Sequence, residues 1–197
     1  MSNLTDLEIY TDEIISGIRE AIASDGRNTV IEIGTALNAW VDKTKALAED
    51  RGVVFFCGNG ASATMAEHMS HDCFQNADLL TYSVSETSHI TAISNDISFE
   101  EIFAYRIRKM CGINDMLITI SSSGNSPNII KAINAAREKG MYVVTISGKS
   151  KDNKARKLGD LNFYVPLDTY GLVESAHAVL LHCWLDLYLE KYKGGRH

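Results

Sequence analysis

A histidine and an aspartate stand four residues apart in the segment 61–74, which we expect to be helical. His68 and Asp72 would then share one helix face, with Cβ atoms about 6 Å apart. Such a pair can bind a metal ion, or one member can orient the other for proton transfer. The same spacing also occurs in solvated surface pairs that do no chemistry, so the neighbouring sequence has to decide between these interpretations.

A glycine-rich turn immediately precedes this segment. The apolar run VVFFC at 53–57 is followed by Gly58, Asn59 and Gly60, and then by Ser62 at the expected start of the helix. Glycine permits a sharp turn and a close approach of a ligand to the backbone, and a helix start presents free N–H groups to anions. In isolation the motif is equally typical of a tight structural turn. Because His68 and Asp72 follow this turn closely, we favour a chemical role for the pair over a solvated surface pair.

A second strand-to-helix turn is rich in hydroxyl groups. The apolar run MLITI leads directly into the loop SSSGNSP. Its serines are Ser121, Ser122, Ser123 and Ser126. Capping of the following helix would explain Ser126, which precedes a proline at the first helical position, but not the other three. A phosphate group has several acceptor oxygens and would use all of them, so the loop favours phosphate or sugar-phosphate binding over capping alone.

Apolar periodicity predicts the elements that position these residues. Helical spacing over 6–23 and 28–49 indicates two amphipathic helices before the first strand. The strands are expected at 53–57, 79–84, 116–120, 142–147 and 162–167, and later helices at 61–74, 99–110, 126–140 and 172–193. Apolar strands that alternate with helices are typical of a parallel sheet covered on both faces. We therefore expect a three-layer α/β/α fold with five parallel strands, whose two ligand turns meet at the carboxyl edge.

The composition limits the class of protein. The 197 residues, 45% of them hydrophobic, suit a single globular domain. A formal net charge of −6 argues against nucleic acid as a partner but allows a small anionic substrate. No apolar run approaches the ~20 residues that span a bilayer, and the acidic N-terminal segment does not resemble a signal peptide. Four scattered cysteines without a CxxC pair indicate reduced thiols and a cytoplasmic protein.

Four stretches of the chain resemble the sugar isomerase (SIS) domain. They are GNGAS, SNDISFEEIF at 94–103, ISSSGNSPNIIKAINAAREKGM, and the closing helix with His177 and His182. His68, Asp72 and His182 narrow the resemblance to the phosphoheptose isomerases, the sedoheptulose 7-phosphate isomerases of bacterial heptose synthesis. The resemblance implies one flavodoxin-like SIS domain, with an α/β core at 51–193. It also implies that residues 1–50 pack in a homo-oligomer, a tetramer with active sites at subunit contacts.

The resemblance also implies roles for individual residues. It assigns phosphate binding to Ser121, Ser122, Ser123 and Ser126, and sugar binding to Asn59, Gly60, Ser62 and Asp96, with Glu174 lining the site. The chemistry falls on Asp72, His68 and His182. An aldose–ketose isomerase moves a proton between C1 and C2 through an enediol, and it needs a base and an acid. We expect Asp72 to be the base and His182 the acid, with His68 as orienter or metal ligand.

Zinc is the cofactor that this set of residues favours, although the resemblance includes family members that work without a metal. His68, Asp72, Glu174 and His182 supply two imidazoles and two carboxylates, which zinc accepts. However, the eight residues from Glu174 to His182 would span about 12 Å of a helix. Either Glu174 precedes the helix proper, or two subunits share the site. Of the other histidines, His71 and His177 are expected to be structural, and His89 is a weak candidate for closing the site.

Four positions depart from the family pattern. The family usually has glutamate where this chain has Asp72 and glutamine where it has Glu174. It often has arginine in place of Asn76 and aspartate in place of Gly171. These changes keep open an isomerase of a different sugar phosphate. A non-catalytic SIS-domain binding protein is a third interpretation, against which the histidine–carboxylate set argues.

Overall fold

Five parallel strands form the centre of the sheet, as the sequence predicts, and two antiparallel strands extend it. In this computed structural model, which describes residues 5–195, the strand order is β2-β1-β7-β6-β5-β3-β4. The strands are β1 (Ile22–Asp25), β2 (Val30–Ile31), β3 (Val53–Gly58), β4 (Leu80–Ser83), β5 (Met116–Ser121), β6 (Tyr142–Ser147) and β7 (Leu161–Tyr164). The three-layer class is confirmed, and the expected number of strands is wrong. Residues 1–4, part of the segment judged not to be a signal peptide, lie outside the described residues.

The two additional strands replace parts of the predicted N-terminal helices. α1 (Asp6–Arg19) ends before the predicted residue 23, and α2 (Ile33–Glu49) begins after the predicted residue 28. Glu32 caps the start of α2 by accepting hydrogen bonds from two N–H groups. Between them Asp25 accepts hydrogen bonds from the N–H groups of Arg27 and Thr29, at 2.9 and 2.8 Å. This side-chain-closed turn folds β2 back along β1. Strands this short show too little alternation to be recognised in a sequence.

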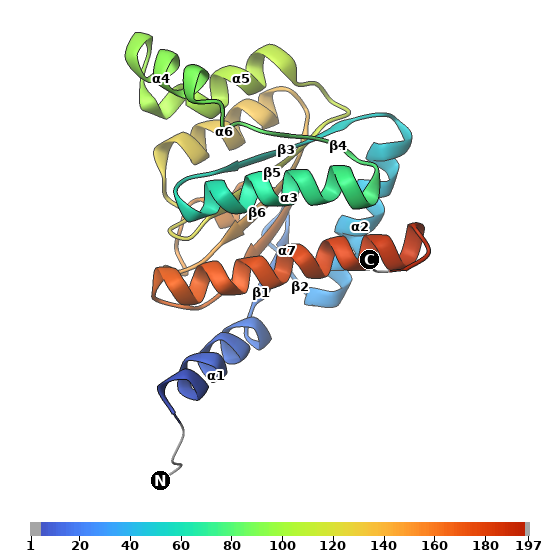
Figure 1. Ribbon diagram of the computed structural model, residues 1–197, viewed down its shortest axis with the longest axis vertical. Coiled ribbons are helices and arrows are strands. Elements are labelled where there is room, and N and C mark those ends of the chain that lie inside the picture. The colour runs from blue at the N-terminus through green and yellow to red at the C-terminus, as the bar shows by residue number, and fades with distance from the viewer. Residues whose placement is uncertain (1–4, 196–197) are drawn as a thin grey trace.

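Helices cover both faces of the sheet (Figure 1). α2, α3 (Ala61–Ala77) and α7 (Tyr170–Tyr192) pack on one face, and α4 (Thr87–Asp96), α5 (Ile102–Met110) and α6 (Pro127–Glu138) on the other. β5 alternates accordingly, because Ile118 and Ile120 face the first group and Leu117 faces the second. α4 was not expected. Two short 3₁₀ turns, η1 (Phe99–Glu101) and η2 (Ala155–Lys157), complete the set.

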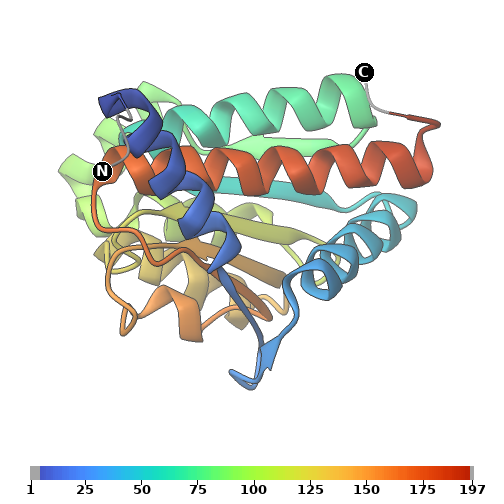
Figure 2. The same cartoon turned by 90° about the horizontal axis from the view of Figure 1, so that it is seen from below.

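α3 and α7 lie side by side, as Figures 1 and 2 both show. α7 is fixed against α2 by an aromatic contact, since the rings of Trp184 and Trp40 stack at 4.3 Å and the Trp184 indole donates a hydrogen bond to Thr44. Side chains on the facing sides of α3 and α7 are therefore held at a defined separation.

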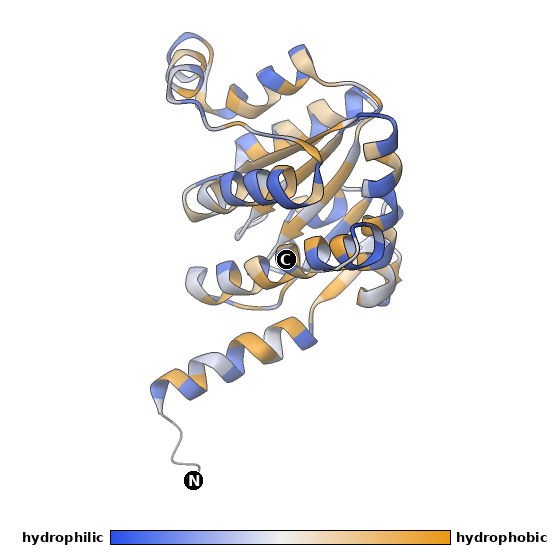
Figure 3. Ribbon diagram, turned by 45° about the vertical axis from the view of Figure 1, so that its right-hand side comes forward, coloured by the Kyte–Doolittle hydropathy of each residue, from blue (hydrophilic) through white to orange (hydrophobic). Residues whose placement is uncertain are grey.

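α1 lies against α7 at the edge of the domain (Figure 2) and carries orange, hydrophobic segments along its length (Figure 3). Ile14 and Ile18 pack against the core, whereas Leu7, Ile9 and Ile15 are exposed. Among the described residues, none of the helices has the length and apolarity needed to cross a bilayer.

Candidate active site

The two strand-to-helix turns meet at the carboxyl edge of the sheet, as predicted. β3 and β5 are neighbours, with Gly58 beside Ile120. A pocket of about 150 Å³ lies between the turns, and we call it the serine pocket. It is lined by Asn59, Ser62, Ile120, Ser121, Ser122, Ser123, Ser126, Tyr170 and Glu174. Seven of the residues assigned to substrate binding thus share one pocket with Tyr170, which nothing in the sequence pattern marked.

The first turn depends on glycine. A Cβ atom on Gly58 would lie 2.3 Å from the backbone oxygen of Ser62, and Gly60 has a φ of 58°. The turn also holds Asn59, whose side-chain amide exchanges two hydrogen bonds with that of Asn128, at 2.9 and 2.8 Å. Because Asn128 belongs to α6, this pair ties the two turns together. Asn128 follows the serine motif directly in the sequence, which could have identified it.

Only some of the hydroxyl groups of the serine loop make hydrogen bonds within the loop. Ser121 and Ser123 each accept a hydrogen bond from a backbone N–H of the loop, at 3.2 Å. Ser126 occupies the N-cap position of α6, but its side chain makes no capping hydrogen bond. Capping therefore does not account for Ser126, and its hydroxyl is available to a ligand.

Glu174 belongs to the serine pocket within this chain. The hydroxyl of Ser122 donates a hydrogen bond to its carboxylate at 3.4 Å. Since α7 begins at Tyr170, Glu174 lies inside the helix, and the alternative in which it precedes the helix is wrong. The carboxylate is not part of the group that could hold a metal ion among the described residues. A role for Glu174 as a ligand shared between subunits stays a prediction.

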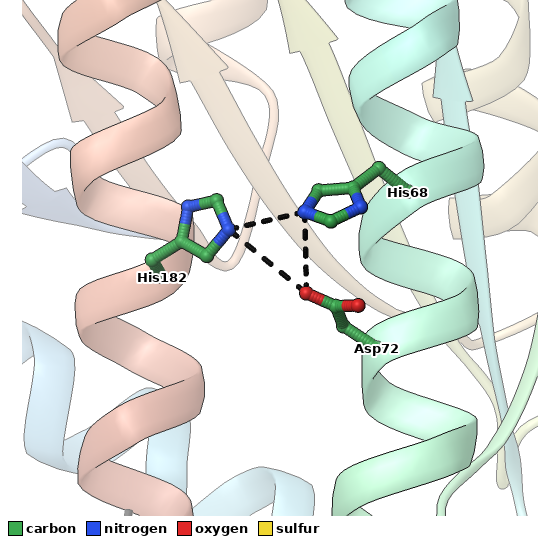
Figure 4. Close-up of side chains that lie close together, drawn as sticks. All are labelled: His68, Asp72 and His182. Carbon is green, nitrogen blue, oxygen red and sulfur yellow. Dashed lines mark hydrogen bonds and ion pairs between the residues drawn. The ribbon is translucent and has the colours of Figure 1, made fainter. Parts of the chain in front are cut away.

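His68, Asp72 and His182 form a cluster between α3 and α7 (Figure 4). The Nε2 atom of His68 lies 3.2 Å from Nε2 of His182 and 3.2 Å from Oδ2 of Asp72. The distance from Nε2 of His182 to the same Asp72 oxygen is 4.0 Å. The two imidazoles are about half exposed, at 52% and 46%, and Asp72 is 22% exposed, so a ligand can reach all three.

The hydrogen bonding of His182 determines which of its nitrogen atoms is free. Its Nδ1 lies 2.8 Å from the carbonyl oxygen of Ala178 and must donate, because a carbonyl only accepts. In the neutral ring Nε2 is then the atom with the lone pair, and it points at the other two members of the cluster. Tetrahedral zinc with bonds of about 2.0–2.1 Å separates its ligand atoms by about 3.3 Å. The spacing in the cluster fits such an ion.

The cluster and the serine pocket lie at different heights along α7. Glu174 lines the pocket and His182 belongs to the cluster, and the eight residues between them rise about 12 Å along the helix. α3 repeats this arrangement, with Ser62 in the pocket and His68 in the cluster. A molecule that reaches both places must therefore be extended.

The remaining predicted residues lie elsewhere. Asp96 is exposed at the end of α4, where it accepts a hydrogen bond from the Asn95 side chain. Gly60 lines an adjoining pocket together with Phe99 and other residues. His89 donates a hydrogen bond to the carbonyl oxygen of Ile102 at 2.7 Å.

The two histidines expected to be structural differ in their environment. His71 is exposed on α3, whereas His177 is completely buried on α7. Burial lowers the pKa of His177 to about 4, and neither of its ring nitrogens has a hydrogen-bond partner among the described residues. His177 is therefore neutral at physiological pH.

Comparisons with known proteins show the family and the fold of the chain. The SIS domain family matches residues 22–148. The chain is 33% identical over 154 residues to the phosphoheptose isomerase of Azoarcus sp., covering 74% of this chain and 78% of that relative. It is 32% identical over 176 residues to that of Aromatoleum aromaticum, covering 85% and 83%. The solved phosphoheptose isomerase of Neisseria gonorrhoeae matches with a TM-score of 0.78 and 26% identity over 92% of this chain and 97% of that one.

Proposed function

Since the chain belongs to the phosphoheptose isomerases of the SIS domain family, we propose that it converts sedoheptulose 7-phosphate to D-glycero-D-manno-heptose 7-phosphate. The reaction is an aldose–ketose isomerisation through an enediol, and its product serves bacterial heptose synthesis for lipopolysaccharide core, capsule or nucleotide-linked heptose. Reduced thiols, three of them buried, suit the cytoplasm as its location.

The separation of the serine pocket from the cluster carries this proposal. An extended seven-carbon chain with a phosphate ester spans about 10 Å, since each C–C bond is about 1.5 Å long. The two sites lie about 12 Å apart along α7. A phosphate bound by Ser121, Ser122, Ser123 and Ser126 therefore leaves C1 and C2 close to Asp72 and His182. Asn59 and Ser62 bind the intervening hydroxyl groups.

In this mechanism Asp72 is the base that takes the proton from C1 and returns it to C2. His182 moves the second proton through Nε2, which acts as the acid at the C2 carbonyl oxygen when it is protonated and accepts a proton from the C1 hydroxyl when it is not. The bond to the Ala178 carbonyl keeps that ring oriented. His68 supports Asp72 from 3.2 Å on the same helix face.

As the alternative to these acid–base roles, we propose zinc as the metal of this cluster, held by His68, Asp72 and His182; Nε2 of His182 is then a ligand and does not transfer a proton. When bound, zinc acts as a Lewis acid toward the substrate oxygens. The spacing of the three ligand atoms and the free lone pair of His182 support this assignment. Glu174 joins this set only if a neighbouring subunit presents it.

We also propose that the chain is one SIS domain that assembles into a homotetramer, with active sites at subunit contacts. The exposed apolar residues of α1 support a role of residues 1–50 in packing, although β1 and β2 of this segment also complete the sheet. Light scattering coupled to size exclusion tests this: a particle of one chain mass, 21.7 kDa, would contradict it.

The direct test of function is incubation with sedoheptulose 7-phosphate in D₂O, followed by NMR. The proposal expects the signals of the heptose aldose, with deuterium incorporated at C2, and a lower rate after treatment with a chelator. If neither conversion nor deuterium exchange at C1 of the ketose occurs, the proposal is wrong.

One observation favours a different sugar phosphate as a second candidate. A Cβ atom on Gly171 would lie 2.6 Å from the hydroxyl of Tyr10, so Tyr10 fills the space where the family often places an aspartate. Asn76 likewise replaces an arginine of the family. Under this candidate a shorter or epimeric ketose phosphate is turned over faster than sedoheptulose 7-phosphate in the same assay.

A further inference from the structure

The serine pocket has an unbalanced charge for a phosphate site. Of its described lining residues, the single charged one is Glu174, and none is cationic. A phosphate dianion bound beside Ser122 would lie close to the carboxylate that the same hydroxyl contacts. Like charges at such a separation repel, and serine hydroxyls alone do not compensate for this. A cation that approaches the pocket from a neighbouring segment would offset this repulsion.

Lys149 is placed to do this by the topology of the sheet. Ser147, the last residue of β6, is paired with Ser121, the last residue of β5. Lys149 follows two residues later at the same edge. Its ammonium nitrogen lies 3.8 Å from the centre of the Tyr170 ring, and Tyr170 itself lines the serine pocket. One aromatic ring thus connects the ammonium group with the pocket.

The backbone of Lys149 is held in an unfavourable conformation. Its φ is 56°, in the left-handed region that residues other than glycine, asparagine and aspartate rarely adopt. Two hydrogen bonds impose it: the N–H donates to the carbonyl of Leu167 at 3.0 Å, and the carbonyl accepts from the hydroxyl of Tyr164 at 2.8 Å. Such local strain is typical of positions where the direction of a side chain matters to a ligand site.

We propose that Lys149 is a phosphate-binding residue of this site. Its ammonium group leaves the face of Tyr170 and pairs with the phosphate bound by the serine loop, which offsets the charge of Glu174. The flexible stem of lysine permits this movement, and the ring holds the cation near the pocket in the absence of ligand. The inference deepens the proposed function and rests on it for the identity of the phosphate ester.

The test compares binding of inorganic phosphate and of sedoheptulose 7-phosphate by calorimetry at low salt. Lys149→Met should raise both dissociation constants about tenfold, and Lys149→Arg should restore most of the affinity. KM should rise with little change in kcat. Lys151→Met is the matched control, because Lys151 lies two residues further on, is exposed and lines a different cleft. It should bind as the unaltered protein does.

Equal affinity of Lys149→Met and the unaltered protein for phosphate would overturn the inference, even if isomerisation is normal. If phosphate binding depends on Lys149 but sedoheptulose 7-phosphate is not isomerised, the proposed function fails and this inference stands. Should Lys149→Met lose its cooperative thermal transition, Lys149→Gly replaces it, because glycine suits the left-handed backbone. Its phosphate affinity must fall by the same factor, and an unchanged value refutes the role.

Discussion

The Nε2 atoms of His68 and His182 lie 3.2 Å apart, although the residues are separated by 114 positions in the chain. The second nitrogen of His182 is engaged with the carbonyl of Ala178, so its Nε2 lone pair faces His68 and Asp72. Either His68 donates a proton into this contact, or a cation lies among the three side chains. Metal titration distinguishes the two arrangements.

Replacing His182 by alanine should weaken zinc binding more than about hundredfold, because it removes one of three ligands. The measurement is competition for zinc with a chelating dye. His71→Ala is the control, since His71 is an exposed histidine on the same helix as His68. Equal zinc affinity in the two variants would show that zinc does not bind at the cluster.

Asp72→Asn should lower kcat for isomerisation about 10²–10⁴-fold, since an amide cannot accept the proton from C1. The melting temperature should change little, because Asp72 is not in the buried core. Asp72→Glu, which introduces the family residue, should retain activity. Glu67→Gln removes an exposed charge from the same helix and should leave kcat unchanged; a comparable loss there would point to a general charge effect.

The sequence was sufficient for the parts of the fold that local pattern determines. Continuous apolar runs marked the five parallel strands, and the glycine and serine turns located the serine pocket, because parallel strands end at one edge. β1 and β2 were missed because their formation depends on pairing with β7 and on the turn closed by Asp25. Tertiary contact, rather than local alternation, forms these strands.

The candidate site shows the same division. The spacing of His68 and Asp72 was informative because one helix fixes it. The position of Glu174 against Ser122 could not be derived, since it depends on where α7 begins relative to the serine loop. Lys149 and Tyr170 lie near the pocket through side-chain packing, for which a single sequence has no periodic signal.

Glu174→Gln should tighten the binding of inorganic phosphate several-fold, because it removes a negative charge from the serine pocket and keeps a hydrogen-bonding group beside Ser122. Calorimetry at low salt measures it, and the gain should shrink as salt is added. Glu190→Gln, on the exposed end of the same helix, serves as the control. A weaker affinity in Glu174→Gln would mean that the carboxylate assists binding.

Gly58→Ala should destabilise the fold by about 1–3 kcal/mol, because the new Cβ atom would lie 2.3 Å from the backbone oxygen of Ser62. Phosphate affinity should fall with it, since the same turn positions Asn59 and Ser62. Gly112→Ala is the matched control, because its Cβ atom would meet nothing within 4 Å. Urea unfolding measures the stability of both variants, and equal midpoints would show that the first turn can relax around the methyl group.

His177 should make the protein sensitive to mild acid. Its pKa is lowered to about 4 in the folded state by burial, against an ordinary value of 6.5. Between these values the unfolded chain binds a proton that the folded chain does not, so stability falls as the pH decreases from 6.5 to 4 and levels off below. The full effect is about 3 kcal/mol at 1.36 kcal/mol per pKa unit.

Urea unfolding between pH 7 and pH 4 measures this loss, and His177→Leu is the informative variant. Leucine does not titrate, so the part of the pH dependence that belongs to His177 should disappear, whereas the variant at pH 7 keeps an apolar, similarly sized group in the core. His71→Leu controls for histidine content, because His71 is exposed. If His177→Leu loses stability toward pH 4 as steeply as His71→Leu and the unaltered protein do, His177 accepts a proton within the fold. The buried site must then contain a partner for the cation.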